Sequence, residues 1–108
     1  MAKGEIEHFG WTATEDRQPP GVRLYVTGKV VTSNGGLQPR LTKTVPQGIN
    51  PTILLLDLTI EDTGIGTTDV APRDVRYEEV IQPDQYRSIT IRWEGRDLHT
   101  ITEITVVH

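Results

Sequence analysis

The chain has 108 residues, no cysteine and a formal net charge of -4. This length is typical of one domain, so residues 1–108 are expected to form a single unit with its own core. The lack of cysteine excludes thiolate zinc sites, iron–sulfur clusters, cysteine nucleophiles and disulfide bonds. With 11 Lys and Arg against 15 Asp and Glu, the chain lacks the positive potential on which binding to a phosphate backbone relies, and no nucleic-acid partner is expected.

Neither a membrane span nor a secretion signal is visible. The longest apolar run, Ile53 to Leu56, is far shorter than the roughly 20 residues of a membrane-spanning helix. Acidic residues and a histidine occupy 1–8, so this segment has no signal-peptide core. A cytoplasmic location is favoured, unless a signal has been removed.

Composition and periodicity favour β-strands. Fifteen threonines and twenty valines and isoleucines stand against three alanines, and β-branched side chains suit a pleated sheet. Apolar and polar residues alternate over 9–13 and 22–30, which predicts two strands with one buried face each. The first strand would turn Phe9 and Trp11 inward. Gly28 interrupts the second strand and predicts a bulge or the close approach of another backbone.

The next strands are separated by turn and loop signals. Residues 33–36 contain the Asn-Gly pair typical of tight turns. Segment 39–46 is bounded by prolines, so its short strand is expected at a sheet edge, where Lys43 would discourage self-pairing. Segment 52–61 starts with apolar residues on both faces and is predicted to be a central strand.

The second half of the chain contains one long connection and further strands. Residues 62–72 are rich in glycine, threonine and acids, and are expected to be an irregular, mobile or functional segment. Strands follow at 75–81 and 89–93. Residues 98–107 do not keep one register, which predicts a bulge near Thr102 or a strand covered on both faces.

Seven or eight short strands joined by Gly, Pro and Asn turns predict an all-β fold. We expect a single antiparallel β-sandwich that is immunoglobulin-like or fibronectin-III-like in strand count and size. A small β-barrel is the alternative. The chain contains no internal repeat and no low-complexity tract.

Candidate metal ligands lack the spacing of known sites. His8 and His99 lie on terminal strands that could be neighbours, but neither a His-x-His nor a His-x-x-x-His pair occurs, so no metal site is expected. Asp62 and Asp69 flank glycines, as in loops that bind calcium, and both are candidate binding residues. Because the order of acids in an EF-hand is absent, a solvated loop is the favoured interpretation.

No catalytic constellation is visible. Ser33 and Ser88 lie outside any nucleophile-elbow pattern, and no cofactor motif occurs. Asp57 lies in the central strand, and if its face is buried the carboxylate needs a partner such as Arg92 or Arg76. We therefore expect no catalytic residues and no cofactor.

Outward-facing residues supply a candidate docking patch. Tyr25, Arg76 and Arg92 are expected on the solvent-facing sides of strands, and tyrosine and arginine are enriched in binding hot spots. An aromatic platform for a sugar ring is the alternative use of such a surface. The candidate rings for it are Trp11, Tyr25, Tyr77 and Tyr86.

These features favour a non-enzymatic interaction or structural module that binds a protein partner through a sheet edge or the 62–72 loop. A carbohydrate-binding or small-ligand-binding module is the alternative, and a metal-dependent hydrolase centred on Asp57 or His99 is a less favoured third hypothesis. The chain would act as a monomer or as a homodimer joined through edge strands.

Overall fold

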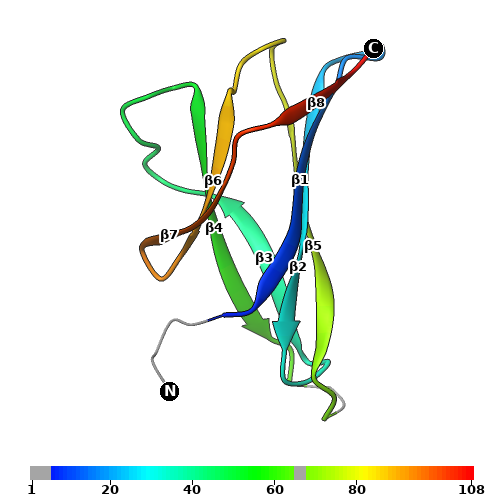
Figure 1. Ribbon diagram of the computed structural model, residues 1–108, viewed down its shortest axis with the longest axis vertical. Coiled ribbons are helices and arrows are strands. Elements are labelled where there is room, and N and C mark those ends of the chain that lie inside the picture. Colours follow the sequence, from blue (N-terminus) through cyan, green and yellow to red (C-terminus); the bar gives the residue numbers. More distant parts are fainter. Residues whose placement is uncertain (1–5, 65–67) are drawn as a thin grey trace.

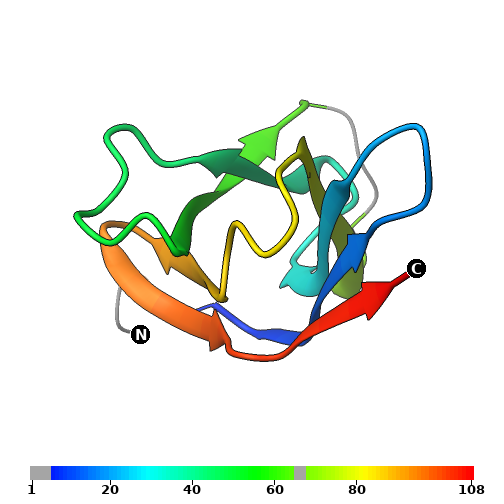
Figure 2. The same cartoon turned by 90° about the horizontal axis from the view of Figure 1, so that it is seen from above.

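Two β-sheets face each other in the computed structural model, which describes residues 6–64 and 68–108 (Figures 1 and 2). The first sheet has the strand order β5-β2-β1-β8 and the second has the order β3-β4-β6-β7. The first contains β1 (His8–Asp16), β2 (Arg23–Thr32), β5 (Ala71–Val80) and β8 (Ile104–Val107). The second contains β3 (Leu37–Lys43), β4 (Ile53–Asp62), β6 (Ser88–Trp93) and β7 (Arg96–Ile101). The described residues form no helix that could cross a membrane.

The predicted all-β sandwich of about seven to eight strands is confirmed, and two separate sheets do not fit the alternative of a small barrel. Both sheets are mixed, because β1 pairs with β8 in parallel and β4 pairs with β6 in parallel. A parallel pair cannot be joined by a tight turn, and in both cases the intervening chain passes through the other sheet. The immunoglobulin-like or fibronectin-III-like arrangement stays a prediction.

Apolar rows from three strands fill the space between the sheets. Their nearly fully buried members are Leu24, Val26 and Val30 of β2, Leu54, Leu56 and Leu58 of β4, and Ile89 and Ile91 of β6. The period of two along a strand places one face of each strand against the opposite sheet. Removal of this apolar surface from water is the main favourable contribution to folding. The inward faces predicted for 22–30, 52–61 and 89–93 are confirmed.

The bulge expected at Gly28 lies instead in the neighbouring strand. The register between β1 and β2 shifts between Phe9 and Thr12, and Gly10 there has a positive φ of 71°. Phe9, predicted to point inward, is consequently 47% exposed, whereas the ring of Trp11 lies against Gly28. A Cβ at Gly28 would overlap this ring. The group that approaches Gly28 closely is therefore the Trp11 side chain, and not another backbone as predicted.

The irregular register predicted near Thr102 is a crossover between the sheets. β7 ends at Ile101 in the second sheet, Thr102 and Glu103 belong to no strand, and β8 begins at Ile104 in the first sheet. Ile101 is buried and Ile104 packs against the same core. The two residues are three positions apart, so one regular strand would place them on opposite faces. The change of parity in the sequence therefore marks a change of sheet.

The proline-bounded strand lies at an edge and β4 is central, as predicted. Beyond the end of β3, the side chain of Gln47 takes the place of a paired strand. Its amide nitrogen donates to the carbonyls of Thr44 (2.8 Å) and Leu55 (2.9 Å), and its amide oxygen accepts from the Leu55 N–H (2.9 Å). Leu55 and Ile53 are half-buried on this outer face, so the predicted two-sided burial of the start of β4 is partial.

We expect Gly28→Ala to lower the melting temperature, because its Cβ would overlap the Trp11 ring and overpacking costs about 1–3 kcal/mol. Gly21→Ala is the matched control, since nothing lies within 4 Å of a Cβ at that position. Thermal unfolding followed by tryptophan fluorescence measures both. An unchanged or higher melting temperature for G28A would contradict the packing, because alanine otherwise suits a strand interior better than glycine.

Gln47→Ala should destabilise the fold by about 1–3 kcal/mol, because it leaves the part-buried N–H of Leu55 without its acceptor. The control is Gln18→Ala, whose side chain makes a single exposed contact of 3.4 Å with the His108 carbonyl. Urea unfolding measures the difference. Equal midpoints for the two variants would show that the Gln47 amide does not support β4.

Candidate functional site

Each sheet has two edge strands, and these differ in how well they are protected. β3 and β5 each contain a proline and at least two charged residues, and β7 carries Arg96, Asp97 and His99. β8 consists of Ile-Thr-Val-Val and has neither a charged residue nor a proline. Proteins use charges and prolines to prevent unwanted pairing at sheet edges. Among the described strands, β8 is therefore the unprotected edge.

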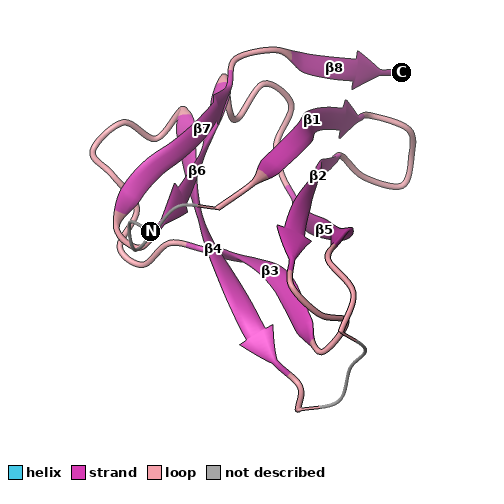
Figure 3. Ribbon diagram, turned by 60° about the horizontal axis from the view of Figure 1, so that its bottom comes forward, coloured by secondary structure: helices cyan, strands magenta, loops and turns pink. Residues whose placement is uncertain are grey.

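β8 is paired on one side only. It runs parallel to the last four residues of β1. The carbonyl of Val107 accepts a hydrogen bond from the N–H of Arg17 at 2.7 Å, so the backbone polar groups of Val107 face β1 and those of Val106 face away. The side chains of Val106 and Val107 are 38% and 36% exposed. In Figures 2 and 3, no part of the described chain lies beyond the outer edge of β8.

A polar cluster closes the opposite side of the sandwich. The Glu79 carboxylate on β5 accepts hydrogen bonds from the hydroxyls of Tyr77 (2.5 Å) and Tyr86 (2.8 Å), and the Lys43 ammonium of β3 lies 3.4 Å away. Partial burial raises the pKa of Glu79, but the two hydroxyls and Lys43 outweigh burial and hold this pKa below its usual range. Lys43, expected to protect a free edge, thus joins the two sheets.

A groove of about 330 Å³ opens where the chain crosses from β7 to β8. Its walls are residues 11–13 of β1 and residues 99–103 and Thr105 of the crossing segment. His8 and His99, whose strands belong to different sheets, meet beside it with ring centroids 6.1 Å apart. The indole N–H of Trp11 donates to Nδ1 of His8 at 2.9 Å, and the ring of His99 stacks on the indole at 6.2 Å.

The two histidines position Trp11. Burial, with a smaller contribution from the charge of His99, lowers the pKa of His8. An indole N–H can only donate, so Nδ1 of His8 must be unprotonated to accept it. Among the residues that the structure describes, no group of three or more His, Asp or Glu side chains could hold a metal ion.

The predicted docking patch is divided between opposite faces of the sandwich. The guanidinium carbon of Arg76 lies 4.9 Å from the centre of the Tyr25 ring, so these two residues do form a cation–π pair on the first sheet. Arg92 belongs to the second sheet, donates to the Gly95 carbonyl at 2.6 Å and lies 3.5 Å from Asp97. One surface containing all three predicted residues is therefore not formed, because the strands that carry them lie in different sheets.

The loop 62–72, for which the sequence favours a solvated loop over a calcium site, lies partly outside the described residues, which omit 65–67. At its start, the Asp62 carboxylate accepts a hydrogen bond from the Gly64 N–H at 2.9 Å. At its end, the Asp69 carboxylate lies 3.3 Å from the guanidinium of Arg73. In the described part, both candidate carboxylates thus take part in local turn and ion-pair contacts.

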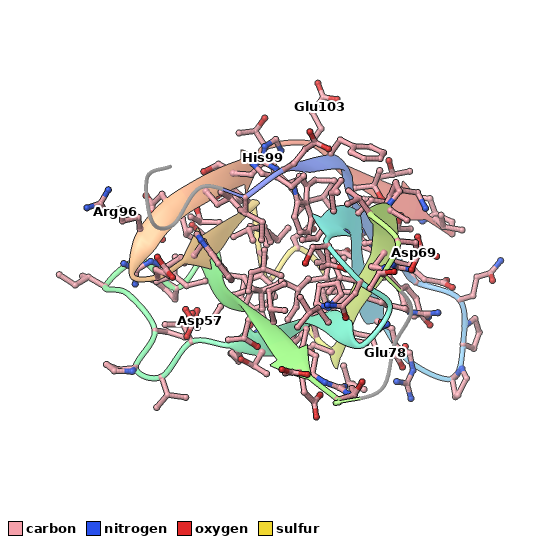
Figure 4. The ribbon with its side chains drawn as sticks, turned by 90° about the horizontal axis from the view of Figure 1, so that it is seen from below. Asp57, Asp69, Glu78, Arg96, His99 and Glu103 are labelled. Carbon is pink, nitrogen blue, oxygen red and sulfur yellow. The ribbon has the colours of Figure 1, made fainter. Side chains whose placement is uncertain are left out.

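Asp57 has a different partner from those predicted. The hydroxyl of Thr44 donates to its carboxylate at 2.9 Å. Arg92 lies opposite Asp57 in the ladder but bonds elsewhere, and Arg76 lies in the other sheet. Figure 4 shows Asp57, Asp69 and Glu103 on different sides of the molecule, an arrangement that gives them no common substrate.

The four rings considered as a sugar platform already contact neighbouring residues. Trp11 lies between Gly28 and His99, and Arg76 covers Tyr25. The hydroxyls of the other two rings, Tyr77 and Tyr86, bond Glu79. A sugar would have to displace one of these contacts before it could stack.

Two exposed apolar surfaces were missed by the sequence analysis. One is the outer edge of β8, whose signal was the absence of charge and proline from 104–107. The other is the loop 44–52, where Val45 is 89% exposed and Ile49 is fully exposed. The sequence pattern did not separate these residues from core residues, because aliphatic side chains occur in both environments.

His8 makes a testable contribution to pH-dependent stability. Its pKa is lowered in the folded protein, so the contribution is fully present above pH 6.5 and is lost as the pH falls through the folded pKa. We expect the melting temperature to fall between pH 7 and pH 5, and His8→Gln to reduce this slope. His108→Gln, at an exposed position, is the control. Equal slopes for wild type and H8Q would exclude this role.

Comparison with known proteins identifies no relative: no family model, no curated protein and no solved structure matches the chain.

Proposed function

We propose that this chain is a non-enzymatic interaction module that binds an extended segment of a protein partner along the outer edge of β8. The observation that carries the proposal is the backbone of Val106, whose N–H and C=O face away from β1 and bond to no other described residue. An extended strand supplies the alternating donors and acceptors that complete such an edge.

The side chains of β8 suit the addition of a strand. Val106 and Val107 are exposed and β-branched, and such side chains pack well against neighbours across a pair of strands. No charge in 104–107 would lose its hydration when the partner binds. Both properties favour an uncharged, β-branched segment as the partner sequence.

The expected complex is reversible. The strand is 4 residues long, and each hydrogen bond in it contributes a net of roughly 0.5–1.5 kcal/mol. Association also costs translational and rotational freedom, which offsets part of this gain. An edge of this length supports transient binding rather than a permanent complex.

Val106→Pro tests the proposal, because proline removes the outward N–H and spares the bonds between β8 and β1. We expect it to weaken binding of a fluorescein-labelled peptide of alternating valine and threonine by at least about tenfold. Fluorescence anisotropy gives the affinity, and thermal unfolding verifies that the variant is folded.

Val45→Lys is the matched control, since it alters a more exposed valine that lies outside every strand. Peptide affinity should be unchanged in V45K. Wild-type affinity in folded V106P, or equally tight binding of a peptide with a central proline, would refute strand addition at β8.

A further inference from the structure

We infer that a second copy of this chain supplies the strand that pairs with β8, in antiparallel orientation about a two-fold axis at Val106. The inference rests on the proposed function and names its partner. The resulting dimer would join the first sheets of both copies into one continuous sheet with the order β5-β2-β1-β8-β8-β1-β2-β5.

The direction of the backbone groups sets the register. Val107 faces β1, so Val106 and Ile104 present their N–H and C=O groups outward, whereas the His108 carbonyl accepts a bond of 3.4 Å from the Gln18 side chain. Antiparallel pairing places outward-facing residues opposite one another. With the axis at Val106, the two copies of Val106 form one hydrogen-bonded pair, and Ile104 of each copy lies opposite His108 of the other.

The side chains are self-complementary in this register. Thr105 of each copy lies opposite Val107 of the other, so β-branched residues meet on one face of the joined sheet. An alternative two-fold axis at Thr105 also places outward-facing residues opposite one another. It sets Val107, however, opposite the charged Glu103 of the second copy. The register centred on Val106 avoids this apolar-to-charged contact.

Charge does not oppose the pairing along the strand itself. Each chain carries a net charge of -4, which repels a second copy at long range. Residues 104–107 carry no charge, so antiparallel pairing brings no like charges directly opposite each other. The other three edge strands lack this property, because each contains charged side chains.

The dimer should be weak and dependent on concentration. A symmetric pair uses the same patch on both copies, and here that patch is a strand of 4 residues. Stable protein–protein interfaces bury about 1,200–2,000 Å², more than so short an edge supplies by itself. Monomer and dimer are therefore expected to exchange rapidly.

Single-cysteine variants test the register, because the chain has no cysteine of its own. In the proposed dimer the two Cα atoms of residue 106 are about 5.5 Å apart, within the range a disulfide needs. Those of residue 107 are displaced by two residues along the strands and lie roughly 8 Å apart, which is outside that range.

Under mild oxidation we expect Val106→Cys to form a covalent dimer at least about tenfold faster than Val107→Cys or Val45→Cys. Non-reducing electrophoresis measures the rates. V45C places the thiol on the other exposed apolar surface, the loop 44–52, at a side chain that is 89% exposed. Equal rates for V106C and V45C would overturn the inference, because they would reflect random collision.

Sedimentation equilibrium of the uncrosslinked chain provides the second measurement. Wild type and V45K should gain mass as concentration rises, whereas V106P should stay monomeric. If wild type stays monomeric up to about 1 mM but β8 still binds the valine–threonine peptide, the inference is wrong and the proposed function stands. If V106P changes neither self-association nor peptide binding, both are wrong.

Discussion

Burial of the facing apolar rows of β2, β4 and β6 holds the two sheets together, and the other features depend on it. These strands lie inside their sheets, so their inward faces can be apolar throughout. The remaining strands are placed around them as edges or near-edges. The edge strands of the two sheets therefore differ in how their outer sides are covered.

The two sides of the sandwich differ in how their edge strands are covered. On one side, Glu79 accepts hydrogen bonds from two tyrosines and pairs with Lys43, which satisfies the half-buried polar groups and joins β5 to β3. On the other side, the chain leaves β7 at Thr102 and adds β8 to the first sheet. The added strand has backbone groups with no partner within the described chain. This asymmetry gives the molecule one edge suited to pairing.

Trp11 connects the core to the open side. Its ring fills the space left by Gly28 and is positioned by His8 and His99, which belong to different sheets. The contact depends on a bulge in β1 that turns Phe9 outward. The bulge in β1 thereby positions the Trp11 side chain, which covers the core beneath the groove.

Local sequence patterns were enough for several predictions. Alternation of apolar and polar residues predicted the all-β class and most inward faces, flanking prolines predicted the edge strand, and apolar residues on both faces predicted the central position of 52–61. These properties depend on neighbours along one strand, where the period of two applies directly. The outward position of Phe9 and the change of sheet at Thr102 could not be predicted. A bulge and a change of sheet both interrupt the alternation of apolar and polar residues in the same way.

By itself, the sequence determined most of the strand segments and most of their buried faces, since hydrophobic periodicity is a local property. Only the tertiary structure decided which strands pair, that Arg76 and Arg92 lie on opposite faces, and that Asp57 bonds Thr44. It also decided that 104–107 is an open edge rather than an interior strand. Pairing joins residues far apart in the chain, and several partners satisfy the same local pattern, so long-range packing makes that choice.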